Sequence, residues 1–131
     1  MAEEVSYDVV VTDPDIAKFS SIVNSCDVLM RVHGSALTNM VFRLGNAAVI
    51  QVVPWGNPDW IASHYFRVPS KQMKLNYMEY SINEEETTLS ELCPRDHAIF
   101  KVPKSLHPQK ADWDTFSRIF LKEQNVKVDV R

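Results

Sequence analysis

The sequence has few of the features that mark metal-binding or nucleic-acid-binding proteins. Its two cysteines, Cys26 and Cys93, stand far apart, with no C-x-x-C pair and no histidine–cysteine group at metal-ligand spacing. We therefore expect ordinary buried thiols rather than a zinc site, and no metal or cofactor. No basic run is present and the net charge is −3 at pH 7. Nothing in this charge pattern favours nucleic acid or an acidic membrane as a partner.

Long apolar runs, internal repeats and low-complexity tracts are also missing. The amino-terminal stretch MAEEVSYDVVV is acidic, and its apolar part is too short for a signal peptide or a membrane-spanning helix. The chain has 131 residues, of which 45% are apolar and 24% charged, which is typical of one globular domain. This length allows a real core but not two substantial lobes.

The first half of the chain alternates strand-like and helix-like segments. Apolar or β-branched runs at 7–12, 27–32 and 47–53 have the length of strands. Between them, apolar residues recur at helical spacing: Ile16, Phe19, Ile22 and Val23, then Leu37, Met40, Val41 and Leu44. Continuous apolar strands joined by amphipathic helices predict an α/β fold, a Rossmann-like parallel sheet with helices on both faces.

Capping residues predict where these helices begin and end. Asp13 is expected to cap the first helix with Pro14 at its first position, and Gly45 to stop the second. Asp13-Pro14-Asp15 also spells D-x-D, a spacing of carboxylates that can bind a metal ion, but capping explains it fully.

The second half is less regular. We expect a helix over 59–66 that carries Trp60, Ile61 and Tyr65, a strand over 73–82, and a short helix or ordered loop over 84–92. The proline-punctuated segment 93–108 is expected to be extended. Asp112 can cap a last helix with one apolar side made of Trp113, Phe116, Phe120 and Leu121. The final VKVDV is a last strand or a docked tail.

The best candidate for a binding site is the junction between the strand at 27–32 and the following helix. Ligands of open parallel sheets lie beyond the carboxyl ends of the strands, where loops lead into helices. The first amides of a helix near Ser35 lack carbonyl partners, which favours a phosphate or diphosphate. Gly34 would let the backbone approach it, while His33 and Thr38 could donate hydrogen bonds. A structural reading stays open, in which Ser35 is an N-cap, Gly34 a tight turn and His33 a structural histidine.

The stretch NSCDVLMRVHGSALTNMVFRLGNAAVIQVVPWG, residues 24–56, resembles the signature of plant family 61 glycosyltransferases, the xylan arabinosyl- and xylosyltransferase group. Members typically carry H-G-A-G-L-T-N, followed by a strand that ends in V-V-P. The resemblance continues through YMEYSI, EEETTL, PRDH and the final W…FLKEQNVKVDV, so it covers nearly the whole chain.

This resemblance implies that residues 1–131 form a single domain, the C-terminal nucleotide-sugar-binding lobe of a two-lobed GT-B fold. It also implies inverting, metal-independent transfer of a pentose from a UDP-sugar to xylan or a related glycan, and a Golgi location for complete members. The chain itself shows no signal or anchor, so its own location is not predicted.

The resemblance also assigns residues to the donor site. Amides at Gly34, Ser35 and Ala36, with His33 and the T-N pair Thr38 and Asn39, would bind the diphosphate and stabilise its charge as it departs. Glu85 and Glu86 are candidates for recognition of ribose or uracil, although carboxylates in a first helical turn need no ligand. Arg95-Asp96-His97 is either a contact to the nucleotide or a loop ion pair.

The chain departs from the family pattern in two places within the motif. Ala36 stands where the family has its second motif glycine, with Ser35 before it, and an alanine forced to positive φ would cost about 1–2 kcal/mol. Arg31 stands where a small residue is expected, and a charged side chain in a buried strand needs a partner. It could contact a phosphate, or the replacement could be a lesion of the site.

The larger departure is length. A membrane anchor and an N-terminal lobe, which is expected to hold the catalytic base, do not fit in this chain. No catalytic residue is therefore assigned here, and we expect little or no transferase activity from this chain alone. The alternative is a non-catalytic nucleotide-binding or pseudoenzyme domain that acts through a partner.

Overall fold

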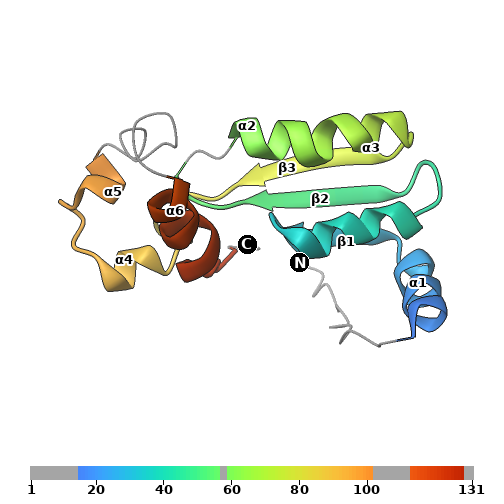
Figure 1. The fold of residues 1–131 in the computed structure, drawn as a ribbon, viewed down its shortest axis with the longest axis horizontal. Helices are drawn as coiled ribbons and strands as arrows, with labels where there is room; N and C mark the ends of the chain where they lie inside the picture. Colours follow the sequence, from blue (N-terminus) through green and yellow to red (C-terminus); the bar gives the residue numbers. More distant parts are fainter. Residues whose placement is uncertain (1–14, 57–58, 102–112, 129–131) are drawn as a thin grey trace, which may run out of the picture.

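A parallel sheet organises the computed structural model, which describes residues 15–56, 59–101 and 113–128 (Figure 1). Its strands are β1 (Val28–Val32), β2 (Ala48–Val53) and β3 (Asn76–Ser81), in the order β1-β2-β3. Helix η1 (Ser35–Phe42) joins β1 to β2, and the helical run α2 (Asp59–Ala62), η2 (Ser63–Arg67) and α3 (Val68–Gln72) precedes β3. The predicted α/β character and parallel pairing are confirmed, while the predicted strand at 7–12 lies outside the described residues.

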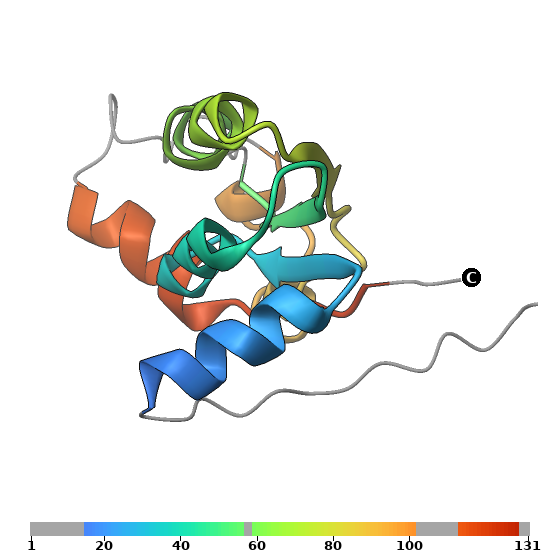
Figure 2. The ribbon, with the colours of Figure 1, turned by 90° about the vertical axis from the view of Figure 1, so that its right-hand side faces the viewer.

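Both connecting helices pack on the same face of the sheet (Figure 2). Leu37 and Met40 from η1 and Phe66 from η2 form one core with Val49 and Leu75. Right-handed crossovers between strands in sequential order place their helices on one side, which explains this arrangement. The opposite face has exposed apolar side chains: Val28, Met30, Val32, Met78 and Tyr80. The expectation of helices on both faces is therefore not met by the described elements.

Helix α1 (Ile16–Ser25) is capped by Asp15, whose carboxylate accepts from the amides of Ala17 at 2.9 Å and Lys18 at 3.3 Å. The predicted cap, Asp13, lies outside the described residues, so the capping carboxylate is two positions later than expected. Phe19 and Val23 are buried as predicted. Ile16 is exposed, because it lies at the very start of the helix.

Helix η1 is a 3₁₀ helix, and this changes which residues it buries. Leu37 and Met40, three residues apart, face the core, whereas Val41 and Leu44 are exposed. Three residues per turn favour an i, i+3 stripe over the i, i+4 pattern of an α-helix. The turn after η1 has its positive φ of 70° at Asn46 and not at the predicted stop, Gly45.

The helical run from Asp59 to Gln72 is longer than the helix predicted over 59–66. Ala62, Phe66 and Ser70 face inward at intervals of four residues. Trp60 and Tyr65, two of the large side chains of the predicted helix, are exposed.

A second core lies beyond the carboxyl ends of β2 and β3 (Figure 1). It is formed by Leu89, Ile99, Phe100, Phe116 and Phe120, with Trp55 packed against it. They come from four short helices and their neighbours: α4 (Leu89–Leu92), α5 (Ala98–Lys101), α6 (Trp113–Phe116) and η4 (Ser117–Glu123). The expectation of an extended segment over 93–108 is wrong at 98–101, which is helical, and 102–112 lie outside the described residues, as does the predicted cap Asp112.

The C-terminal stretch is a docked tail. Val126 forms an isolated antiparallel bridge with Thr87, and the Lys127 amide donates to the Glu86 carbonyl at 2.7 Å. Gln124 joins this tail to the loop after β2, because its amide nitrogen donates to the Trp55 carbonyl at 2.9 Å.

Both cysteines are free, and Cys26 is exposed, contrary to the expectation of two buried thiols. Within 15–56, 59–101 and 113–128, no helix is long and apolar enough to cross a membrane. The same residues include no group of three His, Cys, Asp or Glu side chains that could hold a metal ion.

Candidate functional site

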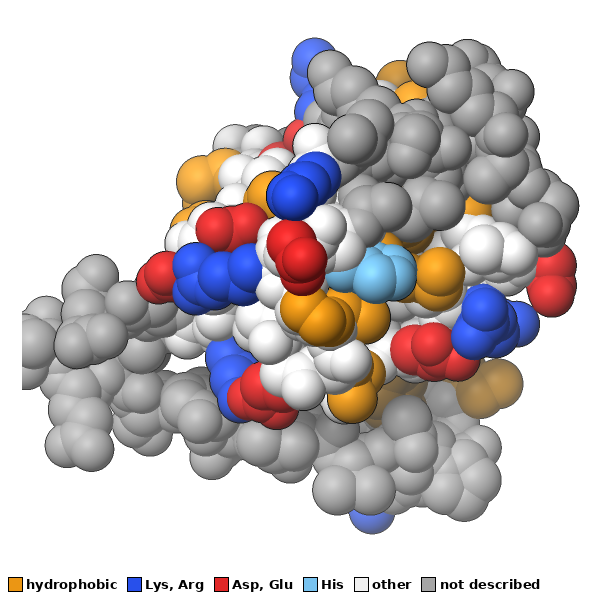
Figure 3. Space-filling model, turned by 90° about the vertical axis from the view of Figure 1, so that its left-hand side faces the viewer, with side chains coloured by type: hydrophobic (Ala, Val, Ile, Leu, Met, Phe, Trp, Pro, Cys, Tyr) orange, Lys and Arg blue, Asp and Glu red, His pale blue; other side chains and the backbone are white. Residues whose placement is uncertain are grey.

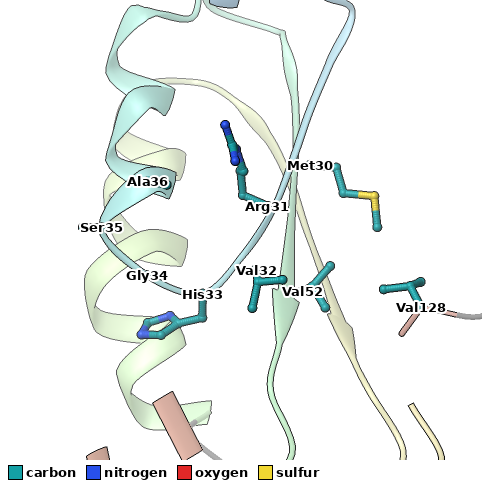
Figure 4. Close-up of a pocket in the computed structure, with 9 residues that line it drawn as sticks. All are labelled: Met30, Arg31, Val32, His33, Gly34, Ser35, Ala36, Val52 and Val128. Carbon is teal, nitrogen blue, oxygen red and sulfur yellow. The ribbon is translucent and has the colours of Figure 1, made fainter. Parts of the chain in front are cut away.

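A pocket of about 460 Å³ lies at the carboxyl end of β1 (Figure 4). Its lining residues are Met30, Arg31, Val32, His33, Gly34, Ser35, Ala36, Val52 and Val128. The four consecutive residues His33 to Ala36 were singled out from sequence, and the structure brings all of them to this pocket.

The backbone at the junction explains the shape of the pocket. The His33 amide still donates to the Val52 carbonyl at 2.8 Å, so the strand ladder reaches this residue. Gly34 then adopts φ 153° and ψ 179°, a conformation that L-residues rarely adopt. Its carbonyl accepts from Leu37 at 3.0 Å, which begins η1. Gly34, not Ser35, therefore occupies the N-cap position, and no side chain caps the helix.

This geometry leaves main-chain donors at the start of η1. The amides of Ser35 and Ala36 donate to no carbonyl among the described residues. Ala36 has no positive φ, so the alanine at the family's glycine position carries no backbone strain. A Cβ added at Gly34 would meet nothing within 4 Å, so glycine is needed there for its conformation rather than for space.

The side chains around the pocket separate by polarity. Figure 4 shows Arg31 and His33 on the side of β1 that faces η1, and Met30 and Val128 on the opposite side. Arg31 is half-buried and forms no ion pair with a described residue. The pocket is thus lined by the cationic residue Arg31, by the residues with free amides at the start of η1, and by an apolar surface.

His33 is half-buried, and burial lowers the pKa of its imidazole below the ordinary value. Its Nδ1 lies 3.0 Å from Gln51 Nε2, and its ring meets the Phe66 ring edge-on at 5.3 Å. Gln51 is fully buried and in turn lies 2.9 Å from the Tyr77 hydroxyl.

Sequence reasoning missed Gln51. Its one signal was a polar residue inside the apolar run AAVIQVV, where an unpartnered amide would be costly.

Tyr77 continues this polar chain towards a charged pair. Its hydroxyl lies 2.7 Å from Glu79, and Arg67 Nε donates to the same carboxylate oxygen at 3.0 Å. Burial, followed by the hydrogen bond to Glu79, raises the pKa of the Tyr77 hydroxyl. Tyr77 also packs against the first core.

Thr38 and Asn39 follow the pocket in sequence but do not line it. The Thr38 hydroxyl donates to the Ser35 carbonyl at 2.5 Å, which engages its only proton.

Glu85 and Glu86 lie on the loop after β3, and neither lines the pocket. Glu86 is buried and accepts from the Tyr80 hydroxyl at 2.6 Å and the Asn83 amide at 3.0 Å. Glu85 is exposed and pairs with Arg95 at 3.4 Å, so Arg95 is part of a loop ion pair. In Figure 3, acidic and basic side chains are interspersed over this end of the molecule.

These features define a class: an α/β unit whose pocket lies where a parallel strand passes through a glycine into a helix. The chain is 44% identical over 131 residues to a β-1,2-xylosyltransferase of Oryza sativa subsp. japonica, which covers 98% of this chain and 23% of that protein. It is 46% identical over 133 residues to an α-1,3-arabinosyltransferase of the same species, covering 98% of this chain and 22% of that protein. A xylan glycosyltransferase of Arabidopsis thaliana is 34% identical over 134 residues, covering 99% of this chain and 26% of that protein.

The chain is thus a homologue of plant xylan arabinosyl- and xylosyltransferases, as the motif resemblance predicted. It spans between 22% and 28% of the length of these relatives. No protein-family model and no solved structure matches it.

Proposed function

We propose that this chain is the nucleotide-sugar-binding part of a family 61 pentosyltransferase, equivalent to the C-terminal lobe of a GT-B fold. Its pocket would bind the diphosphate of a UDP-pentose whose sugar is transferred to xylan. The observation that carries this proposal is the coincidence of the H-G-S-A motif with a pocket into which an uncapped helix start opens.

The pocket offers the interactions that a nucleoside diphosphate needs. The free amides of Ser35 and Ala36 and the cation of Arg31 suit the diphosphate. Met30, Val32 and Val52 supply an apolar surface for the flat face of the base.

In inverting transfer, the acceptor hydroxyl is deprotonated on one face of the sugar while UDP departs from the other. The residues of this pocket would stabilise the charge that builds up on the leaving diphosphate. A preorganised donor of this kind contributes roughly 2.7–4 kcal/mol to the transition state when water is excluded.

The chain would bind its donor without transferring the sugar. No Asp or Glu lines the pocket, so a carboxylate base would have to come from outside the lining residues. The same observation favours a second candidate, a non-catalytic nucleotide-binding domain that acts through a partner. Turnover of UDP-xylose or UDP-arabinofuranose with a xylan oligosaccharide by this chain would contradict both the expected inactivity and the second candidate.

Binding is tested by titrating the chain with UDP and following backbone amide resonances. We expect saturable shifts centred on Gly34, Ser35 and Ala36. Arg31→Met should weaken UDP binding by a factor of about 10 to 150, because a charge-assisted contact is worth about 1.5–3 kcal/mol. Arg95→Met, which removes a cation from the exposed pair with Glu85, is the matched control and should leave the affinity unchanged. Saturable shifts elsewhere, or none, would contradict the proposal.

A further inference from the structure

A chain of polar side chains crosses the helix-covered face of the sheet and ends at the pocket. It runs from Arg67 through Glu79, Tyr77 and Gln51 to His33. The register explains why it forms, since Gln51 on β2 is paired with Glu79 on β3. Paired residues of parallel strands share one face, and this face is the one that η1 and η2 cover.

The direction of the hydrogen bonds follows from counting protons. The Tyr77 hydroxyl has one proton but lies near two oxygens, Glu79 Oε1 at 2.7 Å and Gln51 Oε1 at 2.9 Å. Arg67 contacts both oxygens of Glu79, from Nε and from NH2, so this carboxylate is ionised and can only accept. The Tyr77 hydroxyl therefore donates its hydrogen bond to Glu79.

This assignment decides the orientation of the Gln51 amide. Once the Tyr77 proton points at Glu79, the phenolic oxygen can only accept from Gln51, and only the amide nitrogen can donate. The oxygen and nitrogen of a side-chain amide have nearly the same size, so the surrounding hydrogen bonds fix which occupies each place. Gln51 is fully buried, so water offers no alternative partner. Its oxygen must then face His33 Nδ1.

We propose that Gln51 is a positioning residue that holds His33 with its proton on Nδ1. Nε2 of His33, which lines the pocket, is then an acceptor. The neutral ring can accept a hydrogen bond from a ligand hydroxyl, but it can donate to a diphosphate oxygen only after taking up a proton. This last step rests on the proposed function, because it requires a diphosphate in the pocket.

The charged groups around His33 are few. Arg31 lies on the same strand, and η1 and β2 carry no titratable side chain. From η2 come Arg67, paired with Glu79, and His64, whose Nδ1 contacts the Trp60 carbonyl at 2.9 Å. An imidazolium at His33 would be stabilised through Gln51 and Tyr77 by the Glu79 carboxylate, and opposed by Arg31.

The test in the free chain is the tautomer of His33, read from long-range proton–nitrogen correlation spectra above the pKa of the imidazole. We expect Nδ1 to be protonated and Nε2 to be unprotonated. In Tyr77→Phe, the phenolic acceptor is lost, the Gln51 amide can turn, and both tautomers should be populated. Tyr80→Phe removes a hydroxyl of the same strand that bonds Glu86 instead, and it should keep the single Nδ1–H form.

A proton on Nε2 in the parent chain would overturn the proposal, as would an unmixed Nδ1–H form in Tyr77→Phe. Glu79→Gln provides a second variant, because a neutral amide at position 79 allows the Tyr77 proton to point either way. It should also give mixed tautomers.

Calorimetric titration with UDP in buffers of different ionisation enthalpy then measures protons taken up on binding. We expect uptake of up to one proton above the pKa of His33, and none in His33→Asn. Absence of UDP binding in a chain with the Nδ1–H form would refute the proposed function and leave the role of Gln51 intact, so the two failures are distinguishable.

Discussion

Gly56 is a residue whose missing side chain is essential to the packing of the second core. It has φ 111°, and an added Cβ would lie 2.2 Å from Cδ1 of the fully buried Phe120 ring. Gly56→Ala therefore combines backbone strain with overpacking, and we expect a loss of about 2–4 kcal/mol in the free energy of unfolding. Urea denaturation measures this loss.

Gly45→Ala is the matched control, because its nearest added contact is the Met73 carbonyl at 3.9 Å and its φ is not in the left-handed region. It should change the free energy of unfolding by less than about 1 kcal/mol. Equal urea midpoints for the two variants would show that the loop at Gly56 moves away from Phe120 at little cost.

His33 makes a pH-dependent contribution to stability. Because burial lowers its pKa, the unfolded chain binds a proton at a higher pH than the folded chain does. The free energy of unfolding should therefore fall as the pH drops through the unfolded value of about 6.5, and level off below the folded pKa. His33→Asn should remove this part of the acid loss. A stability difference between parent and variant that is constant from pH 8 to pH 5 (roughly, the range in which histidine titrates) would contradict it.

The residues of the pocket were predictable from sequence to different extents. His33 and Gly34 stand between a strand-like run and a helix-like run, so their place at the junction follows from the local pattern. Gln51 was not predictable, because its partners His33 and Tyr77 meet it only through the strand pairing. The contact of the Thr38 hydroxyl with the Ser35 carbonyl, one turn back, was not predicted either.

At the scale of elements, strands were easier to predict than helix faces. The run 27–32 contains β1 and 47–53 contains β2, since β-branched residues strongly favour strands. Helix faces failed where the helical period departs from that of an α-helix, as in η1. Aromatic residues also lie outside the core. Trp60 packs edge-on against Trp113, with their ring centroids 6.4 Å apart.

Arg43 connects α1 to the rest of the domain through hydrogen bonds. Its buried guanidinium donates to the Val23 carbonyl near the end of α1 and to the Asp27 carbonyl at 3.0 Å. Arg43→Leu would leave these carbonyls without their donor, and we expect a loss of about 1–3 kcal/mol. Amide hydrogen exchange should accelerate in α1 more than in β2.

Arg118→Leu is the control for this prediction. It removes an exposed ion pair with Glu123, whose side chain is 48% accessible, and exposed pairs contribute at most about 1 kcal/mol. Exchange in α1 that is equally slow in the parent and in Arg43→Leu would mean that the Phe19–Phe42 contact alone holds the helix.

At the scale of the whole molecule, the sequence indicates a parallel sheet but not which of its faces is covered. That depends on the order of the strands and on where the short helices of the second half pack. Composition gives no hint of a second core, because the residues that form it come from three separated segments. The pocket could be located because it depends on one junction, whereas the layers depend on contacts between distant parts of the chain.

The exposed sheet face leads to a prediction about the isolated chain. Parallel sheets are normally buried on both faces, yet Val28 is 47% exposed, Met30 44% and Met78 52% on the face opposite the helices. We expect this continuous apolar surface to bind an environment-sensitive apolar dye while the chain is folded. Met78→Lys places a charge on this surface, halfway along the edge strand β3, and should reduce dye fluorescence by at least about half, with little change in unfolding free energy.

Leu92→Lys separates the effect of the sheet face from that of exposed apolar residues in general. Leu92 is 67% exposed but lies on α4, away from the sheet, so its replacement should leave the dye signal close to that of the parent. If both variants lowered the signal equally, the dye would be reporting scattered apolar side chains. If only Met78→Lys lowered the signal, the dye would be binding to the sheet face. Met78, Ile50 and Met30 lie side by side in the strand register on that face, so a charge at position 78 interrupts one connected surface.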